Sequence, residues 1–217
     1  MSKRTVIVSG GILEKEFVLP ILQSEETEFI IVVDKGLQFL YENGIKPDYI
    51  VGDFDSVPRE IVEYYRTEEN VPIREFNPVK DASDTEIALR LCLGLRRKEI
   101  YILGGTGNRI DHLWANIQCL NIALAAGSEA MILDSHNRIR ILEHGITLTR
   151  AEAFGKYFSV FPLELPVEDF SISGAKYPLQ NHLLSAGDSL CVSNEFAEDE
   201  VKISFVCGKV ILMETRD

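Results

Sequence analysis

Residues 99–112 read EIYILGGTGNRIDH, a short apolar run followed by a glycine-rich turn and a polar segment. The run has the length and the β-branched content of a buried strand. From Asp111 to about Ala126, apolar residues recur at helical spacing, and Gly127 supplies a stop. A strand, a turn and a helix in this order predict one unit of an α/β fold.

The same alternation of short apolar runs and helical segments extends over the chain to about Asp134. Ahead of one helical segment, Ser83 and Glu86 have the spacing of a capping box, in which a serine caps the helix start and a glutamate reaches back. We therefore predict an α/β domain with a mainly parallel sheet. Its expected strands are Thr5–Ser9, Phe29–Val33, Tyr49–Val51, Glu99–Leu103 and Ala130–Leu133.

The last third of the chain has a different pattern. After about Leu142 the helical periodicity ends, and short apolar runs alternate with turn residues, which is typical of an all-β domain. We predict an α/β domain over residues 1–142 and a smaller all-β domain over residues 143–217, joined near Glu143–Leu148. Its expected strands are Tyr157–Phe161, Phe170–Ser173, Ser189–Val192, Val201–Val206 and Val210–Met213, with Cys207-Gly208-Lys209 turning the last two into a hairpin.

The composition argues against several classes of protein. The chain has 217 residues, 46% of them hydrophobic, and can bury a substantial core. No segment approaches the roughly 20 consecutive apolar residues of a membrane span, and the N-terminus lacks a signal-peptide core, so we expect a cytoplasmic protein. The formal net charge of −12 argues against a nucleic-acid partner. Without any CxxC spacing for zinc or redox chemistry, core packing is expected for Cys92, Cys119, Cys191 and Cys207.

Small or acidic residues follow the predicted strands of the α/β domain, where an open parallel sheet binds its ligands. Small residues let a backbone approach a phosphate, and the next helix offers unpaired N–H groups and the positive end of its dipole. The glycine-rich turn lacks the Lys-Ser/Thr ending of a P-loop and does not match GxGxxG, so neither motif applies. The residues expected to bind a nucleotide are Ser9, Gly10, Asp34, Gly36, Gly104, Gly105, Thr106 and Gly107.

Aspartates at these strand ends predict a cation site. Asp53 and Asp55 are one residue apart, which in an extended chain points both carboxylates to the same side. Alone, such a pair is more often a solvated turn than a metal site. Asp84 and Asp111 begin two helices at what should be the same edge, so four carboxylates would converge on Mg²⁺. Asp81 could support Asp84 or act as an additional ligand.

Three residues near the glycine-rich turn have open interpretations. Arg109 could hold the charge that develops as a phosphoryl group transfers, or could form a surface ion pair with Asp111. His112 is more often a structural hydrogen-bonding group at a helix start than a base or a ligand. Trp114 is predicted to pack in the core or against a helix. Taken together, the strand ends predict an enzyme that handles a nucleotide polyphosphate through Mg²⁺.

Several motifs occur in a characteristic order along nearly the whole chain. They are Val33-Asp34-Lys35-Gly36, Pro47-Asp48, Gly52-Asp53-Phe54-Asp55-Ser56, Lys80-Asp81 to Thr85, Gly104-Gly105 to Asp111-His112, Ser173-Gly174 to Leu179 and Val192-Ser193-Asn194-Glu195. The ordered set resembles the thiamine pyrophosphokinase family. The resemblance implies transfer of a pyrophosphoryl group from ATP to the hydroxyl of thiamine, giving thiamine diphosphate and AMP.

The resemblance also implies catalytic roles for five residues. Asp53, Asp55, Asp84 and Asp111 look like the carboxylates that hold Mg²⁺ and order the phosphates, and Arg109 looks like the stabiliser of transferring charge. Positioning and charge neutralisation would then supply most of the acceleration, because phosphoryl-type transfer needs little covalent work from the protein.

For the second domain, the resemblance implies a β-sandwich that completes the thiamine site. Tyr177 would stack on the flat, cationic thiamine, and Ser193 and Asn194 would hydrogen-bond to its aminopyrimidine. Ordinary strand and turn chemistry stays an alternative for all three. The implied assembly is a homodimer in which the sandwich of one subunit faces the catalytic domain of the other. Lys35 departs from the family, which often has a second small glycine there, and could add a positive charge.

Two other functions stay open at this point. A diphosphokinase acting on another hydroxymethyl heterocycle, such as a pterin, would have the same aspartates, because the second domain carries the discrimination. A thiamine-binding or regulatory protein without catalysis would have no need of a clustered metal site. The aspartates together with Arg109 favour the enzyme.

Overall fold

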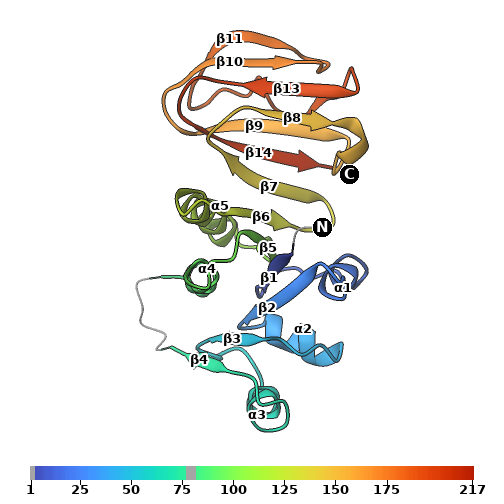
Figure 1. Cartoon of the computed structure of the whole chain (residues 1–217), viewed down its shortest axis with the longest axis vertical. Coiled ribbons are helices and arrows are strands. Elements are labelled where there is room, and N and C mark those ends of the chain that lie inside the picture. The colour runs from blue at the N-terminus through green and yellow to red at the C-terminus, as the bar shows by residue number, and fades with distance from the viewer. Residues whose placement is uncertain (1–2, 77–81) are drawn as a thin grey trace. The chain divides into compact units, whose positions relative to one another are not determined.

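The computed structural model describes residues 3–76 and 82–217, which fall into two compact units (Figure 1). The first unit runs to Ser135 and the second from His136 to Asp217. Strand β7 (Asn137–Leu142) therefore belongs to the second unit, where it pairs along its length with β14 (Lys209–Thr215). The boundary expected from the sequence lies after residue 142, at the end of β7, whereas the two compact units meet before β7 begins.

The first unit is a parallel sheet with helices between its strands, as predicted. Its strands are β1 (Arg4–Val8), β2 (Thr27–Val33), β3 (Tyr49–Gly52), β4 (Ile73–Glu75), β5 (Glu99–Leu103) and β6 (Glu129–Leu133), in the spatial order β6-β5-β1-β2-β3-β4. Each neighbouring pair is parallel. Its helices are α1 (Lys15–Leu22), α2 (Gly36–Glu42), α3 (Arg59–Thr67), α4 (Asp84–Gly94) and α5 (Ile110–Ala125).

Burial on both faces explains why the strands are continuous apolar runs. Ile7, Ile31 and Ile102, from three neighbouring strands, have no exposed surface. Among the described helices, none is both long and apolar enough to cross a membrane. The packing role expected of the cysteines is confirmed for Cys92, Cys119 and Cys191, which are free and buried, whereas Cys207 is partly exposed.

The predicted helix boundaries have the expected local causes. The Ser83 hydroxyl caps α4 by accepting a hydrogen bond from the Glu86 N–H at 3.2 Å. The Glu86 carboxylate accepts a hydrogen bond from Arg90, one turn further along the helix, at 2.8 Å. Gly127, with φ of +66°, follows the end of α5 in the left-handed conformation that favours glycine.

The second unit is an antiparallel β-sandwich, as the family resemblance implied. One sheet has the order β12-β9-β14-β7 and the other β11-β10-β13-β8. Phe158 and Leu212 from the first sheet and Phe170 and Val201 from the second share one buried core. Its remaining elements are β8 (Ile146–Thr149), η1 (Arg150–Glu152), β9 (Tyr157–Glu164), β10 (Val167–Ser173), β11 (Leu179–Leu184), β12 (Asn194–Glu195) and β13 (Glu200–Ser204).

Three predictions for this unit are wrong. Residues 189–192 form turns, and the strand begins later, at Asn194. The segment expected to connect the domains contains the start of β8. Strands β13 and β14 are no hairpin, because they lie in different sheets. Gly208 is needed for close packing in this connection, since a Cβ on it would lie 2.4 Å from the Pro166 carbonyl oxygen.

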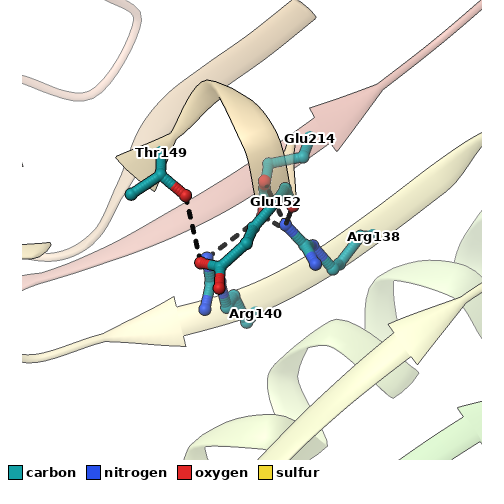
Figure 2. A network of polar contacts seen from close by, with 5 residues as sticks. All are labelled: Arg138, Arg140, Thr149, Glu152 and Glu214. Atoms are coloured by element: carbon teal, nitrogen blue, oxygen red, sulfur yellow. Dashed lines mark hydrogen bonds and ion pairs between the residues drawn. The ribbon is translucent and has the colours of Figure 1, made fainter. Parts of the chain in front are cut away.

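A buried carboxylate fixes the pairing of β7 with β14. Glu214 is 3% exposed and is the cross-strand partner of Arg138. It accepts hydrogen bonds from Arg138 Nε at 2.8 Å and from Arg140 Nη2 at 3.1 Å (Figure 2). Arg138 also donates to the Glu152 carbonyl oxygen, and the Glu152 carboxylate accepts from Thr149. The network thus links both strands to the short turn η1.

Glu214→Gln tests the contribution of this network to stability. Glutamine has nearly the same shape but no charge and only one acceptor oxygen, so the two guanidinium groups lose the buried negative charge that they share. We expect the free energy of unfolding to fall by about 1–3 kcal/mol. Chemical denaturation followed by circular dichroism measures this change.

Glu164→Gln is the matched control, because Glu164 forms an exposed ion pair with Lys209 at 2.9 Å in the same unit. Loss of such a surface pair costs at most about 1 kcal/mol. Equal losses of stability in the two variants would contradict a structural role for Glu214.

Candidate active site

The residues predicted to bind phosphate and cation lie at one edge of the parallel sheet. Strands β5, β1, β2 and β3 are neighbours and run in the same direction. Their carboxyl ends therefore share an edge, as the strand-end argument predicts. Strand β5 leads into Gly104–Gly107 and β1 into Ser9–Gly10. Strand β2 leads into Asp34–Gly36 and β3 into Asp53–Asp55.

The turns after β1 and β5 are joined backbone to backbone. The Gly11 N–H donates to the Gly104 carbonyl oxygen at 2.9 Å, and the Ile12 N–H to that of Thr106 at 2.9 Å. A Cβ on Gly11 would lie 2.0 Å from the Thr106 oxygen. Gly104 has φ of +66°, and a Cβ on it would lie 2.3 Å from the Ser9 oxygen. These two glycines are therefore required by the packing of the turns on each other.

Two buried polar side chains hold this edge in place, and the sequence did not indicate either role. Asn116, on α5, donates from Nδ2 to the Gly105 carbonyl oxygen at 2.8 Å. The Thr85 hydroxyl, on α4, lies 2.9 Å from the Ser9 hydroxyl at the end of β1. The second contact brings the start of α4, and with it Asp84, to the shared edge. A polar residue inside an apolar helical stripe, such as Asn116, was the available signal.

Asp34 lies against the end of the next strand. It has φ of +44°, an uncommon backbone conformation outside glycine. A Cβ on Gly52 would lie 2.2 Å from Asp34 Oδ1, so the Asp34 carboxylate occupies the space beside Gly52. Since Asp53 follows Gly52, the structure brings Asp34 next to the predicted cation site. Gly36 starts α2 against β1, where a Cβ would lie 2.4 Å from the Val8 oxygen.

Asp53 and Asp55 follow β3 in a turn, so the extended conformation predicted for this segment is wrong. Phe54, between them, has φ of +57°. Asp53 Oδ1 accepts a hydrogen bond from the Asp55 N–H at 3.2 Å. Both carboxylates remain at the end of the strand, but the turn places them there. The Asp48 carboxylate of the same motif region is structural, since it accepts from the Ile30 N–H at 2.7 Å.

The predicted carboxylates do not form a preassembled metal cage. Within residues 3–76 and 82–217, no three His, Cys, Asp or Glu side chains are grouped so as to hold a metal ion. Asp81 lies outside the described residues. Mg²⁺ in phosphoryl-transfer sites is usually held by one or two carboxylates, with waters and substrate phosphates as further ligands. The oxygen donors of Asp53 and Asp55 suit that coordination.

Arg109 and Asp111 form a surface ion pair, one of the alternatives that the sequence left open. Arg109 Nε and Nη2 donate to the two Asp111 carboxylate oxygens at 3.1 and 2.5 Å, and both side chains are exposed. Hydrogen bonding by Arg109 lowers the pKa of Asp111 to about 2. The carboxylate therefore stays ionised at any pH near neutral. Trp114 is 51% exposed, so of its two predicted locations, in the core or against a helix, the core is wrong.

In the second unit, the predicted thiamine-binding residues cluster around an exposed ring. Tyr177 is 55% exposed, whereas Asn194 is 1% exposed. Asn194 Oδ1 accepts from the Tyr177 and Glu195 N–H groups at 3.0 and 2.9 Å, and its Nδ2 donates to the Tyr177 oxygen at 2.8 Å. The Asn194 amide thus fixes the backbone that carries Tyr177, so the structural alternative holds for Asn194, and the prediction that it binds the aminopyrimidine is wrong because the amide is buried and bonded to backbone. The exposed Ser193 has φ of +54°, and its N–H donates to Ser159 Oγ at 2.9 Å.

Comparison with known proteins assigns both units to one family. Residues 22–132 match the family model described as the catalytic domain of thiamin pyrophosphokinase, and residues 143–210 match its vitamin B1 binding domain. A thiamine pyrophosphokinase of Bacillus subtilis (strain 168) is 31% identical over 214 residues, which cover 97% of this chain and 98% of the relative. The chain belongs to the thiamine pyrophosphokinase family.

Solved structures of the thiamine pyrophosphokinase family share the whole architecture. The crystal structure of the Bacillus subtilis enzyme superposes with a TM-score of 0.88 at 30% identity, covering 99% of this chain and all of that chain. The Geobacillus thermodenitrificans enzyme gives a TM-score of 0.84 at 31% identity, with 99% and 98% covered. The predicted fold, a parallel α/β unit followed by a smaller β-sandwich, is therefore that of the family.

Arg109→Met tests the cause of the low Asp111 pKa. Without the bidentate partner, we expect this pKa to rise from about 2 toward the ordinary value for aspartate, about 3.9. Any stability that the pair contributes is present above the unfolded-state pKa and is lost as the pH falls through the folded-state value. Carbon-13 NMR titration of the aspartate carboxyl groups measures the shift.

Arg90→Met is the control, because Arg90 forms an exposed helical ion pair with Glu86 and does not contact Asp111. It should leave the Asp111 titration unchanged. An Asp111 pKa that stays near 2 in Arg109→Met would show that another group stabilises the carboxylate.

Proposed function

We propose that this protein transfers a pyrophosphoryl group from ATP to the hydroxyl of thiamine, giving thiamine diphosphate and AMP. The observation that carries the proposal is the match of the family's catalytic and vitamin B1 binding models to the two structural units, in that order. The convergence of the predicted strand ends on one sheet edge supports it. Localisation in the cytoplasm stays a prediction.

ATP would lie along the shared edge of the first unit. The glycines of the two turns, Gly10, Gly104, Gly105 and Gly107, present backbone without side chains, and the start of α5 provides N–H groups and a positive dipole end. Ser9, Asp34, Gly36 and Thr106 complete the expected nucleotide site. The exposed Arg109 can exchange Asp111 for a phosphate oxygen and so hold charge that develops on the transferring group.

Mg²⁺ would be held by Asp53 and Asp55, with Asp84 and Asp111 as further ligands, and the carboxylates would order the phosphates through the ion. The ion, when bound, neutralises phosphate charge. The contribution of the chain would be to bring these carboxylates to one sheet edge, Asp53 and Asp55 through the turn at Phe54 and Asp84 through the contact between Ser9 and Thr85. Acceleration would come chiefly from positioning.

Thiamine would bind at the exposed ring of Tyr177, by stacking and by attraction between the cation and the ring quadrupole. The engagement of Asn194 with the backbone holds this ring in a fixed place, which lowers the entropy lost on binding. Ser193 is exposed next to it and can offer a hydroxyl to the aminopyrimidine.

A product assay with the purified protein, ATP, Mg²⁺ and thiamine tests the function. We expect AMP and thiamine diphosphate to appear in equal amounts, and only when thiamine is present. Formation of ADP or free phosphate would show a different reaction class. If a hydroxymethyl pterin accepts the pyrophosphoryl group faster than thiamine does, the proposed substrate is wrong.

Asp55→Asn provides the matched variant for this assay. It keeps the shape of the side chain but removes a charge from the proposed Mg²⁺ site, so turnover should fall at least about 100-fold. Thiamine binding, measured by calorimetry, should persist because Tyr177 lies in the other unit. Wild-type turnover would remove Asp55 from the mechanism.

We further propose a homodimer with active sites shared between subunits, the sandwich of one facing the catalytic unit of the other. Large apolar side chains exposed on both units support it, namely Ile110 and Trp114 on α5 and Tyr177, Leu183 and Leu190 in the sandwich. Ile110 and Trp114 are one helical turn apart and so lie on the same face. Large apolar side chains that are exposed in a single subunit are often buried at interfaces.

Sedimentation equilibrium tests the assembly. The wild type is expected to have twice the mass of the 24.4 kDa chain. Trp114→Glu should weaken the dimer at least about tenfold, because it places a charge in the apolar contact. Leu95→Glu, at an exposed apolar position at the end of α4, is the control and should leave the mass unchanged. A monomeric wild type would contradict the proposal.

A further inference from the structure

A group of charged side chains surrounds Tyr177 in the sandwich. Lys176 Nζ lies 5.4 Å from the centroid of the Tyr177 ring and 2.7 Å from Glu195 Oε1. Lys156 Nζ lies 3.8 Å from Glu195 Oε2 and 3.1 Å from the Tyr157 hydroxyl. A single carboxylate is thus shared by two ammonium groups, one of which also lies over the exposed ring.

The backbone holds this arrangement together. The Lys176 N–H donates to the Glu195 carbonyl oxygen at 2.9 Å, and a bridge pairs Ala175 with Phe196 on one side of it. On the other side, the buried Asn194 amide binds the Tyr177 backbone at both its N–H and its oxygen. The backbone therefore keeps Lys176, Tyr177 and Glu195 adjacent in every side-chain conformation.

Both partners of the central ion pair remain charged near neutral pH. Hydrogen bonding by Lys176 lowers the pKa of Glu195, and hydrogen bonding by Glu195 raises the pKa of Lys176. A cation over an aromatic ring draws on the same electron density that would attract a second cation. Lys176 and a cationic ligand therefore compete for Tyr177, and Glu195 attracts both.

We propose that Lys176 and Glu195 set the affinity of the Tyr177 site for a cationic ring: Lys176 competes with the thiazolium charge, and Glu195 attracts it. The inference rests on the proposed function, in which thiamine binds at Tyr177. It adds two specificity-determining residues, which act on the charge of the substrate. When thiamine binds, the Lys176 ammonium group moves away from the Tyr177 ring and stays paired with Glu195.

Lys176→Met tests the competition. Methionine keeps a long, flexible side chain over the ring but removes the charge. We expect the dissociation constant for thiamine, measured by calorimetry, to fall about two- to fivefold, as for one exposed cation–π contact. A neutral analogue with carbon in place of the thiazolium nitrogen should bind both proteins equally, because it has no charge to repel.

Glu195→Gln should have the opposite effect. It removes the attracting carboxylate and leaves Lys176 uncompensated, so thiamine should bind about two- to fivefold more weakly and the neutral analogue should be unaffected. Lys176→Arg keeps the charge and should retain the wild-type preference for thiamine over the analogue. Lys209→Met, which removes a lysine paired with Glu164 elsewhere in the sandwich, is the control for a general change of charge.

The outcomes separate this inference from the proposed function. If the wild type and Lys176→Met bind thiamine with equal affinity, the inference is wrong. AMP formation with thiamine would in that case still support the proposed function. A change of equal size for thiamine and the neutral analogue would overturn the inference too, since that would reflect shape. A wild type that neither binds thiamine nor forms AMP would contradict both proposals. Circular dichroism of each variant establishes that the fold is intact.

Discussion

The contact between the turns after β1 and β5 is the constraint on which the catalytic unit depends. Gly11 meets Gly104 and Ile12 meets Thr106 through backbone hydrogen bonds of 2.9 Å, with no room for a Cβ on Gly11. Asn116 then fixes this joined edge to α5. Because the turns are held by backbone and by one buried amide, the strand ends are positioned before any ligand binds. Such preorganisation is what phosphoryl-type transfer requires from a protein.

The sequence was sufficient to predict the parallel sheet, but not to predict which strands pair with each other in the sandwich. A parallel strand buried on both faces is a continuous apolar run, as at residues 30–33 of β2, and its neighbours follow from the βα order. In the sandwich, alternation identifies a strand without identifying its sheet, so β13 and β14 were paired wrongly. Strand β11 was missed because half of its residues are polar and Asn181 has φ of +50°.

The candidate site could be predicted by residue type and location, but not by conformation. Small and acidic residues at strand ends sufficed to identify the edge, because chain direction fixes where parallel strands end. The left-handed turn at Phe54 was not predicted, since φ above zero is uncommon for residues other than glycine. Thr85 was named only as the end of the motif that begins at Lys80, although its hydroxyl joins α4 to β1. Trp114 fits the apolar stripe of α5, but periodicity cannot tell a buried face from an exposed one.

The two units therefore control function by different means. In the α/β unit, backbone contacts and glycines form the sheet edge, so a side chain added at Gly11 or Gly104 would disturb the geometry itself. In the sandwich, the buried Asn194 holds the backbone of Tyr177, while the charges around the ring come from exposed side chains. Charges at the exposed positions can change with little cost to the fold. Preference for a cationic ring over a neutral one can consequently be adjusted at Lys176 and Glu195 while the fold of the first unit stays the same.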